Sequence, residues 1–135
     1  MGQRTLFEGA IEISRTDYTT SIEQGDDVVD VAIEGVEERV TSLPILHFTL
    51  DYPFERPYQG EVITDAGASL RNIIDAVRAA YRQMYRGASI EPIANLANKR
   101  VCGAYGEAVH VIEDLVIESI ALEDETGQLD IFIGS

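Results

Sequence analysis

One amphipathic segment constrains the fold of this chain more than any other: residues 69–87, with the sequence SLRNIIDAVRAAYRQMYRG. Its apolar residues recur at steps of three and four, which places them on one face of an α-helix. Ser69 suits the N-cap, where its hydroxyl can accept a backbone N–H, and Gly87 suits the position after the last turn, where positive φ is favoured. The pattern therefore predicts one long helix of about seventeen residues. Its buried face should contain Leu70, Ile73, Ile74, Val77, Ala80, Tyr81 and Met84.

The segments on either side of this helix have the alternation of β-strands. Residues 5–50 predict roughly two to four antiparallel strands, and residues 115–122 and 129–133 flank the turn DETG as a hairpin. A weaker helical pattern begins at Ser89 and predicts a short second helix. We therefore expect an α+β fold in which an antiparallel sheet of roughly four to six strands packs on the long helix. The expected order of strands, helix, short helix and hairpin is β-grasp-like.

Length and composition predict a single α+β domain over residues 1–135. The chain is 45% apolar but has no run of about 18 uncharged apolar residues. Its first residues lack the apolar region of a signal peptide, and Cys102 is its only cysteine, which gives no disulfide framework. We therefore expect a soluble, cytoplasmic protein without membrane association. No motif in the sequence predicts a cofactor or a metal site.

The charge of the chain is strongly acidic and unevenly distributed. Its net charge is −14, from 24 acidic and 10 basic side chains. Residues 66–101 hold six basic and two acidic side chains, whereas the segments on both sides are acidic. Because nucleic-acid affinity comes largely from the neutralisation of phosphates by Lys and Arg, direct nucleic-acid binding is disfavoured.

Four arginines recur along the predicted helix and form the first candidate binding surface. Arg71, Arg78, Arg82 and Arg86 follow one another at steps of seven, four and four, which aligns them on the polar side of the helix. A planar guanidinium grips carboxylates with two hydrogen bonds, so such a row suits an acidic partner or a second copy of the chain. The alternative is that these arginines pair within the domain, with Asp75 and with acidic loops.

The loop DYPFERPYQG, residues 51–60, forms the second candidate binding surface. Its aromatic residues Tyr52, Phe54 and Tyr58 lie between prolines and follow neither helical nor strand periodicity. Such a loop either caps one end of the core or leaves its aromatic rings exposed as binding anchors. A small-ligand pocket between this loop and the helix start at Ala68 is the corresponding expectation.

The stretch CGAYGEAVHVIED, residues 102–114, gathers reactive residue types without a catalytic signature. It contains Cys102, His110, Glu113 and Asp114. A thiol nucleophile needs a base held beside it, and nothing in the spacing of Cys102 and His110 imposes such proximity. Four-ligand zinc binding would need His47 and carboxylates that show no ligand spacing. No catalytic residue is therefore predicted, and an enzyme that uses these histidines and carboxylates ranks last among the functions.

Three functional classes follow from these patterns. The first is a protein-protein interaction or self-assembly module, which forms a homo-oligomer or docks a partner through the arginines and the acidic sheet. The second is an acidic decoy that occupies a nucleic-acid-binding protein by imitating its charge. The third is a small enzyme or ligand-binding domain with a pocket near residues 51–60.

Overall fold

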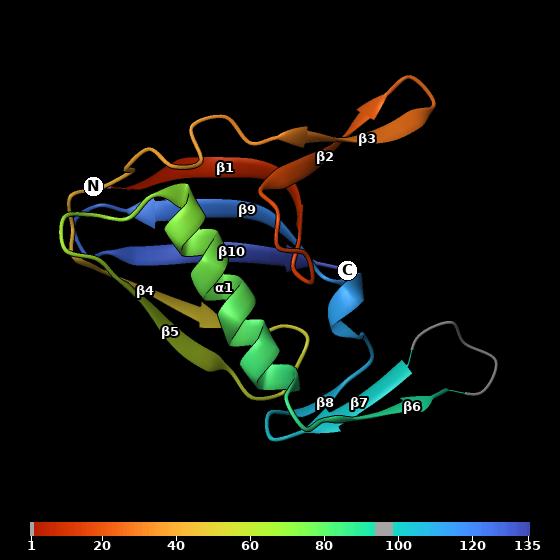
Figure 1. Cartoon of the computed structure of the whole chain (residues 1–135). Coiled ribbons are helices and arrows are strands. Elements are labelled where there is room, and N and C mark those ends of the chain that lie inside the picture. Colours follow the sequence, from red (N-terminus) through yellow and green to blue (C-terminus); the bar gives the residue numbers. More distant parts are fainter. Residues whose placement is uncertain (1, 94–98) are drawn as a thin grey trace.

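The computed structural model describes residues 2–93 and 99–135 as an α+β fold with one α-helix and a mixed five-stranded sheet (Figure 1). Two smaller sheets project from this centre. In chain order the elements are β1 (Gln3–Glu12), β2 (Thr19–Gln24), β3 (Asp27–Ala32), β4 (Ile45–Leu50), β5 (Tyr58–Ile63), α1 (Leu70–Tyr85), β6 (Ser89–Pro92), β7 (Lys99–Gly103), β8 (Gly106–Ala108), the 3₁₀ turn η1 (Ile112–Asp114), β9 (Val116–Glu123) and β10 (Gln128–Gly134).

The predicted helix is present, with the expected cap and buried face. The Ser69 hydroxyl accepts the backbone N–H of Asn72, whose side chain in turn accepts the backbone N–H of Ser69. Gly87 follows the helix with a φ of +72°. All seven apolar residues predicted for the inner face are buried. The predicted long helix is corrected to a short one, because α1 has 16 residues and spans about 24 Å.

The five-stranded sheet has the order β1-β9-β10-β4-β5, and its strand directions correct the prediction of a wholly antiparallel sheet. The terminal hairpin of β9 and β10 is confirmed, as are antiparallel pairs of β1 with β9 and of β4 with β5. However, the hairpin inserts between β1 and β4, so that β10 lies parallel to β4. The order of elements also differs from the predicted β-grasp-like order, because five strands precede α1 and a small sheet follows it.

The predicted short helix after Ser89 is wrong where the structure describes it. Ser89–Pro92 form β6, which pairs antiparallel with β7 and places Ile90 opposite Val101. This pairing outweighs the weak helical pattern, and Pro92 is tolerated because β6 is an edge strand. The remaining part of that prediction, residues 94–98, lies outside the described residues.

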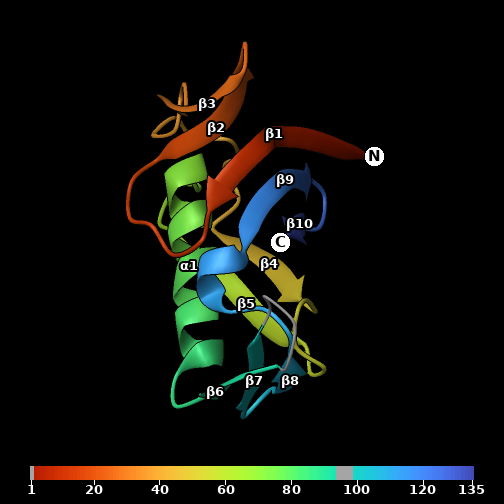
Figure 2. The same ribbon diagram turned by 90° about the vertical axis from the view of Figure 1, so that its right-hand side faces the viewer.

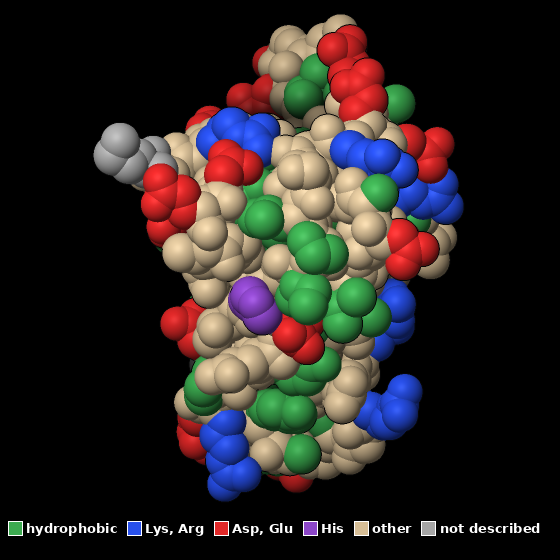
Figure 3. Space-filling view, turned by 90° about the vertical axis from the view of Figure 1, so that its left-hand side faces the viewer, with side chains coloured by type: hydrophobic (Ala, Val, Ile, Leu, Met, Phe, Trp, Pro, Cys, Tyr) green, Lys and Arg blue, Asp and Glu red, His purple; other side chains and the backbone are tan. Residues whose placement is uncertain are grey.

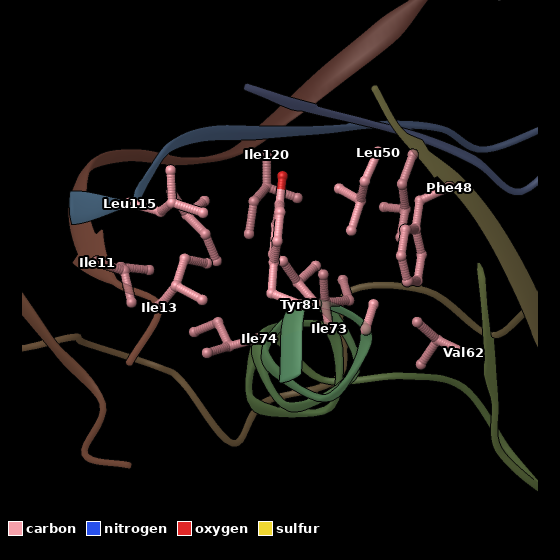
Figure 4. Packing of buried hydrophobic residues seen from close by; sticks show 14 of the residues in the cluster. Ile11, Ile13, Phe48, Leu50, Val62, Ile73, Ile74, Tyr81, Leu115 and Ile120 are labelled. Atoms are coloured by element: carbon pink, nitrogen blue, oxygen red, sulfur yellow. The ribbon is translucent and has the colours of Figure 1, made fainter. Parts of the chain in front are cut away.

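The core lies between α1 and one face of the sheet (Figures 2 and 4). Ile73, Ile74 and Tyr81 point from the helix toward the strands, where they meet residues such as Leu50 and Ile120 (Figure 4). In the described residues α1 is the sole α-helix, so the other face of the sheet has no helix over it. That helix does not combine the length and the apolarity needed to cross a bilayer, and the described ranges contain no other candidate.

The uncovered face carries exposed side chains at alternate strand positions. In β4 the exposed residues His47 and Thr49 alternate with the buried residues of the core side. At the end where β4 begins and β5 finishes, the exposed Ile45 and Ile63 stand opposite each other. Figure 3 views the molecule from this end and shows hydrophobic side chains gathered between acidic and basic ones. This face is therefore accessible to other molecules along β4 and at the paired end of β5.

Candidate functional site

A cleft opens where the parallel strands β4 and β10 separate. The two strands share a single ladder pair, Gln128 with His47, beside which the His47 N–H donates to the Gly127 carbonyl at 2.8 Å. Beyond this point the strands diverge (Figure 1). The resulting cleft has a volume of about 580 Å³, which is in the usual range of ligand sites. Its walls are residues 49–52 on the β4 side and residues 128–133 of β10.

Backbone groups of both strands face this cleft. Because successive residues of a strand direct their N–H and C=O groups to opposite sides, the groups that face the partner strand recur at every second residue. The His47 N–H and the Gly127 carbonyl face each other across the two strands. The N–H and C=O groups of Thr49 in β4 and Ile131 in β10 therefore face the same gap, where the described ladder has no further pair. The cleft offers unused strand edges on both walls.

Tyr81 closes the cleft on the side of the helix. Its side chain rises from α1 between Leu50 and Ile120 (Figure 4), and its hydroxyl donates to the Tyr52 carbonyl at 2.5 Å. Burial raises the pKa of the Tyr81 hydroxyl above its ordinary value, which keeps it protonated as a donor. This bond attaches the loop after β4 to the helix and holds Tyr52 at the wall of the cleft.

The rim of the cleft is acidic and partly apolar. Asp51 and Asp130 are exposed on opposite walls, and Asp130 accepts a hydrogen bond from the Gln3 side chain. Phe132 is 68% exposed beside them. A neighbouring hollow of about 410 Å³ over β4 and β5 adds Glu61, whose carboxylate lies 3.5 Å from the His47 ring. None of the described residues that line either hollow is Lys or Arg, so the site favours cationic groups.

A cluster of four polar residues adjoins the cleft through Tyr52. The Tyr52 hydroxyl lies 2.5 Å from Oγ of Ser135, which lies 3.1 Å from Nε2 of His110. On the other side of the imidazole, Nδ1 of His110 is 3.5 Å from a carboxylate oxygen of Asp114. The order of groups is therefore phenol, hydroxyl, imidazole and carboxylate. We call these residues the Ser135 cluster.

The imidazole in this cluster is held by its surroundings. The His110 side chain is 18% exposed, and its Nδ1 is buried with no hydrogen-bond partner among the described residues. The backbone carbonyl of His110 accepts a hydrogen bond from the Tyr85 hydroxyl at 2.7 Å. Asp114 ends η1, where its backbone N–H donates to the Val111 carbonyl. The carboxylate beside Nδ1 of His110 is thus positioned by the 3₁₀ turn η1.

The predicted row of arginines is divided between buried and exposed positions. Arg78 is only 2% exposed, and its guanidinium donates to the carbonyls of Glu12 (2.8 and 3.2 Å) and Asp17 (2.6 Å). Burial lowers the pKa of Arg78 from its ordinary value, although Asp17 opposes this effect. Arg71 donates to Glu37 at 2.6 Å and lies over the Tyr18 ring. These two arginines make contacts within the chain.

The other two arginines of the row are exposed, as Arg71 is. Arg82 borders a small hollow of about 230 Å³ together with Arg15 and Tyr18. Arg86 is the C-cap residue of α1. They lie on the helix side of the molecule, whereas the β4–β10 cleft lies within the sheet. The structure therefore does not bring the arginines and the cleft together.

The three predicted aromatic residues have different surroundings. Phe54 is 3% exposed and packs edge-on against Tyr85, with ring centres 4.8 Å apart. Tyr58 is half-buried against Tyr105. Tyr52 is at the cleft. These contacts of the loop are with the second half of α1, whereas the expected pocket was beside Ala68 at the helix start.

Sequence reasoning missed Ser135 and the role of Tyr81 as the closed end of the cleft. The spacing of His110 and Asp114 by four residues was the one local signal for the cluster. Sγ of Cys102, from the same stretch of sequence, lies 3.6 Å from a Glu107 carboxylate oxygen. Burial and Glu107 raise the pKa of the Cys102 thiol, which makes it a poor nucleophile.

Comparison with known proteins adds no functional information. No protein family, no curated protein and no solved structure shows significant similarity to this chain.

Proposed function

We propose that this chain is a protein-binding module whose β4–β10 cleft holds an extended, basic segment of a partner protein. The observation that carries the proposal is the single-pair ladder between β4 and β10, which leaves backbone groups of Thr49 and Ile131 directed into an acidic cleft. The proposal keeps the protein-interaction function expected from the sequence. It places the docking site at the sheet instead of at the arginines of α1.

The backbone of the cleft supports recognition by strand addition. In this mode an extended peptide pairs with an exposed strand, so that main-chain hydrogen bonds supply affinity and side-chain contacts supply specificity. Thr49 and Ile131 offer donors and acceptors on both walls. The exposed ring of Phe132 provides an apolar contact beside them.

The charge of the site supports a basic partner. Asp51 and Asp130 flank the cleft, and the whole chain carries a net charge of −14. Complementary charge increases association rates and disfavours partners of the same sign. Arg71 and Arg78 already donate hydrogen bonds within the chain. They therefore have fewer N–H donors left for the acidic partner that the sequence spacing of the arginines suggested.

The acidic-decoy function is the second candidate, and the net charge of −14 favours it. A decoy attracts a basic nucleic-acid-binding protein through its total charge, wherever the carboxylates are placed. A strand-addition site instead depends on the two carboxylates at the cleft and on the backbone of the bound segment. The two candidates therefore respond differently to the position of a lost charge.

Fluorescence anisotropy with designed peptides tests the proposal. The probe is a labelled eight-residue peptide of alternating Lys and Val, compared with an alternating Glu and Val peptide. We expect the double substitution D51N and D130N to weaken binding of the Lys peptide about tenfold. The matched control D26N and D27N removes the same charge from the exposed tip of the β2–β3 hairpin and should change affinity less than about twofold.

A modified peptide isolates the role of the backbone. N-methylation of alternate residues keeps the charge but removes N–H donors, and it should abolish binding. If the methylated peptide binds equally well, or if both double variants lose the same affinity, total charge alone explains binding and the decoy function is favoured. No binding of the unmodified Lys peptide overturns both candidates. Sedimentation velocity on the same samples tests self-association, the other form of assembly expected from the sequence.

A further inference from the structure

The Ser135 cluster has the order of groups that activates a serine hydroxyl. A serine nucleophile requires a base within about 2.6–3.2 Å and a third group that orients the base. Oγ of Ser135 lies 3.1 Å from Nε2 of His110, and the opposite ring nitrogen faces Asp114 at 3.5 Å. The second distance exceeds a normal hydrogen bond, as is common before a substrate is bound.

The Tyr52 hydroxyl completes this arrangement. It lies 2.5 Å from Oγ of Ser135. If Ser135 donates its proton toward His110, then Tyr52 must donate toward Ser135, because each hydroxyl has one proton. A phenol in this position is also a donor for negative charge that develops beside the serine. Tyr52 is 36% exposed and lines the cleft, so this end of the cluster is accessible.

We propose that Ser135 is a nucleophile that accepts the acyl group of a carboxylic ester, with His110 as its base. Asp114 is a positioning residue for the imidazole, and Tyr52 donates a hydrogen bond to the oxyanion. This activity goes beyond the proposed binding of a partner segment and does not depend on it.

The reaction is hydrolysis of the ester by way of an acylated serine. Oγ of Ser135 bonds to the carbonyl carbon while its proton passes to Nε2 of His110, and the carbonyl electron pair becomes an oxyanion beside the Tyr52 hydroxyl. When the oxyanion collapses, the bond to the ester oxygen breaks and the departing alcohol takes the proton from His110. Water then attacks the acyl-serine, with His110 again accepting and returning a proton. The products are a carboxylic acid, the alcohol and the original serine.

Several contacts favour this function over a simple hydrogen-bonded lock at the end of β10. Nδ1 of His110 is buried 3.5 Å from Asp114 and makes no hydrogen bond to any described residue, so no other described group occupies this nitrogen in place of Asp114. Ser135 itself is exposed, which gives an ester access to Oγ. The cleft next to Tyr52 provides space for the acyl or alcohol portion of a substrate.

Labelling with a fluorophosphonate probe tests the proposal directly, because such probes phosphonylate activated serines. The sites of modification are identified by peptide mass spectrometry, and the rate of modification is measured over time. We expect Ser135 to react in the wild type and S135A to lose this label. The exposed Ser42 is the internal control, and the substitution S42A should leave the rate at Ser135 unchanged.

The variants of the surrounding residues distinguish activation from simple exposure. We expect H110Q to slow the labelling of Ser135 by about 100-fold, the usual size of a general-base contribution. Y52F should slow it by about 100-fold as well, since it removes one oxyanion donor while retaining the ring. Circular dichroism tests whether each variant is folded. If H110Q does not fold, the effect of Y52F on the labelling rate tests the proposal.

A conservative pair of variants tests Asp114, whose contribution is indirect. We expect D114N to slow the labelling of Ser135, because it removes the carboxylate that lies 3.5 Å from Nδ1 of His110. D114E retains a carboxylate and should restore part of the rate, whereas a purely structural role of Asp114 in η1 would make the two variants alike.

Two results overturn the proposal. The first is labelling of Ser135 no faster than that of Ser42. The second is rapid labelling of Ser135 that H110Q and Y52F leave unchanged, which would mean that the hydroxyl is exposed without being activated. Hydrolysis of p-nitrophenyl acetate by the full chain, with a burst of nitrophenol that S135A abolishes, supports the complete reaction.

Discussion

The arginine side of α1 and the β4–β10 cleft differ in how much of their bonding capacity the fold itself uses. On the arginine side, Arg78 donates to two backbone carbonyls and Arg71 pairs with Glu37. In the cleft, backbone groups of Thr49 and Ile131 face open space between two separating strands. Arginines that stand out in a sequence can thus form their hydrogen bonds within the same chain. Unpaired backbone groups of a strand can instead form a candidate binding site, although no residue type in the sequence indicates them.

The largest expected effect concerns Arg78, the most buried member of the arginine row. R78M should lower the free energy of unfolding by about 3 kcal/mol, because it removes a buried guanidinium and three part-buried hydrogen bonds to the carbonyls of Glu12 and Asp17. Urea denaturation monitored by circular dichroism measures this change. R82M is the matched control at an exposed position, and its effect should be within about 0.5 kcal/mol.

Equal and small effects of R78M and R82M on the free energy of unfolding would contradict the claim that the fold uses the bonding capacity of Arg78. Arg78 would then not be committed to the fold, and its guanidinium would again be available to a partner. A large effect of R78M together with a small effect of R82M confirms that Arg78 stabilises the fold.

A smaller effect is expected at the closed end of the cleft. Y81F removes the hydroxyl that donates to the Tyr52 carbonyl but keeps the buried ring. It should cost about 1 kcal/mol of unfolding free energy, the typical value of one buried hydrogen bond. Y58F is the control, since the Tyr58 hydroxyl is 3.4 Å from Gln83 and only weakly bonded. No difference between the two variants in urea denaturation contradicts the claim that Tyr81 fastens the loop.

The parts of the fold that were predicted correctly depend on local patterns. The inner face of α1 follows from its periodicity, and its cap follows from Ser69 and Gly87. The terminal hairpin follows from two β-rich runs around one turn. The errors involve partners that are distant in sequence. β6 forms because Ile90 meets Val101, and β10 lies parallel to β4 because a hairpin inserts beside it.

The candidate site was predictable only in fragments, for the same reason. Tyr52 was predicted as one of the candidate binding residues, and the spacing of His110 and Asp114 was visible in the sequence. Their common partner is Ser135, which is 83 residues from Tyr52 and 25 from His110 in the sequence. No periodicity or motif connects such positions, because they meet only when β10 is placed in the sheet.

The smallest expected effect concerns Arg15, whose side chain donates to Glu12, Asp17 and Asp30 on the arginine side of the molecule. This guanidinium holds the pKa values of Asp17 and Asp30 below their ordinary values. R15Q should raise both pKa values, as measured by NMR titration of the side-chain carboxyls. The pKa of Asp124, which Arg4 lowers, is the internal control and should not move.

The sign of the accompanying stability change follows from these pKa shifts. A carboxyl whose pKa is lower in the folded than in the unfolded chain stabilises the fold above its unfolded pKa, near about 4, and loses that contribution as the pH falls through its folded pKa. The wild type should therefore be slightly more stable than R15Q at neutral pH, and the difference should disappear in acid. A difference that persists below the folded pKa values would show that Arg15 acts through packing. In that case the packing of the Arg15 side chain would stabilise the arginine side of the molecule in addition to its ion pairs. The contrast with the open β4–β10 cleft, where backbone groups of Thr49 and Ile131 face the gap between the strands, would then be larger.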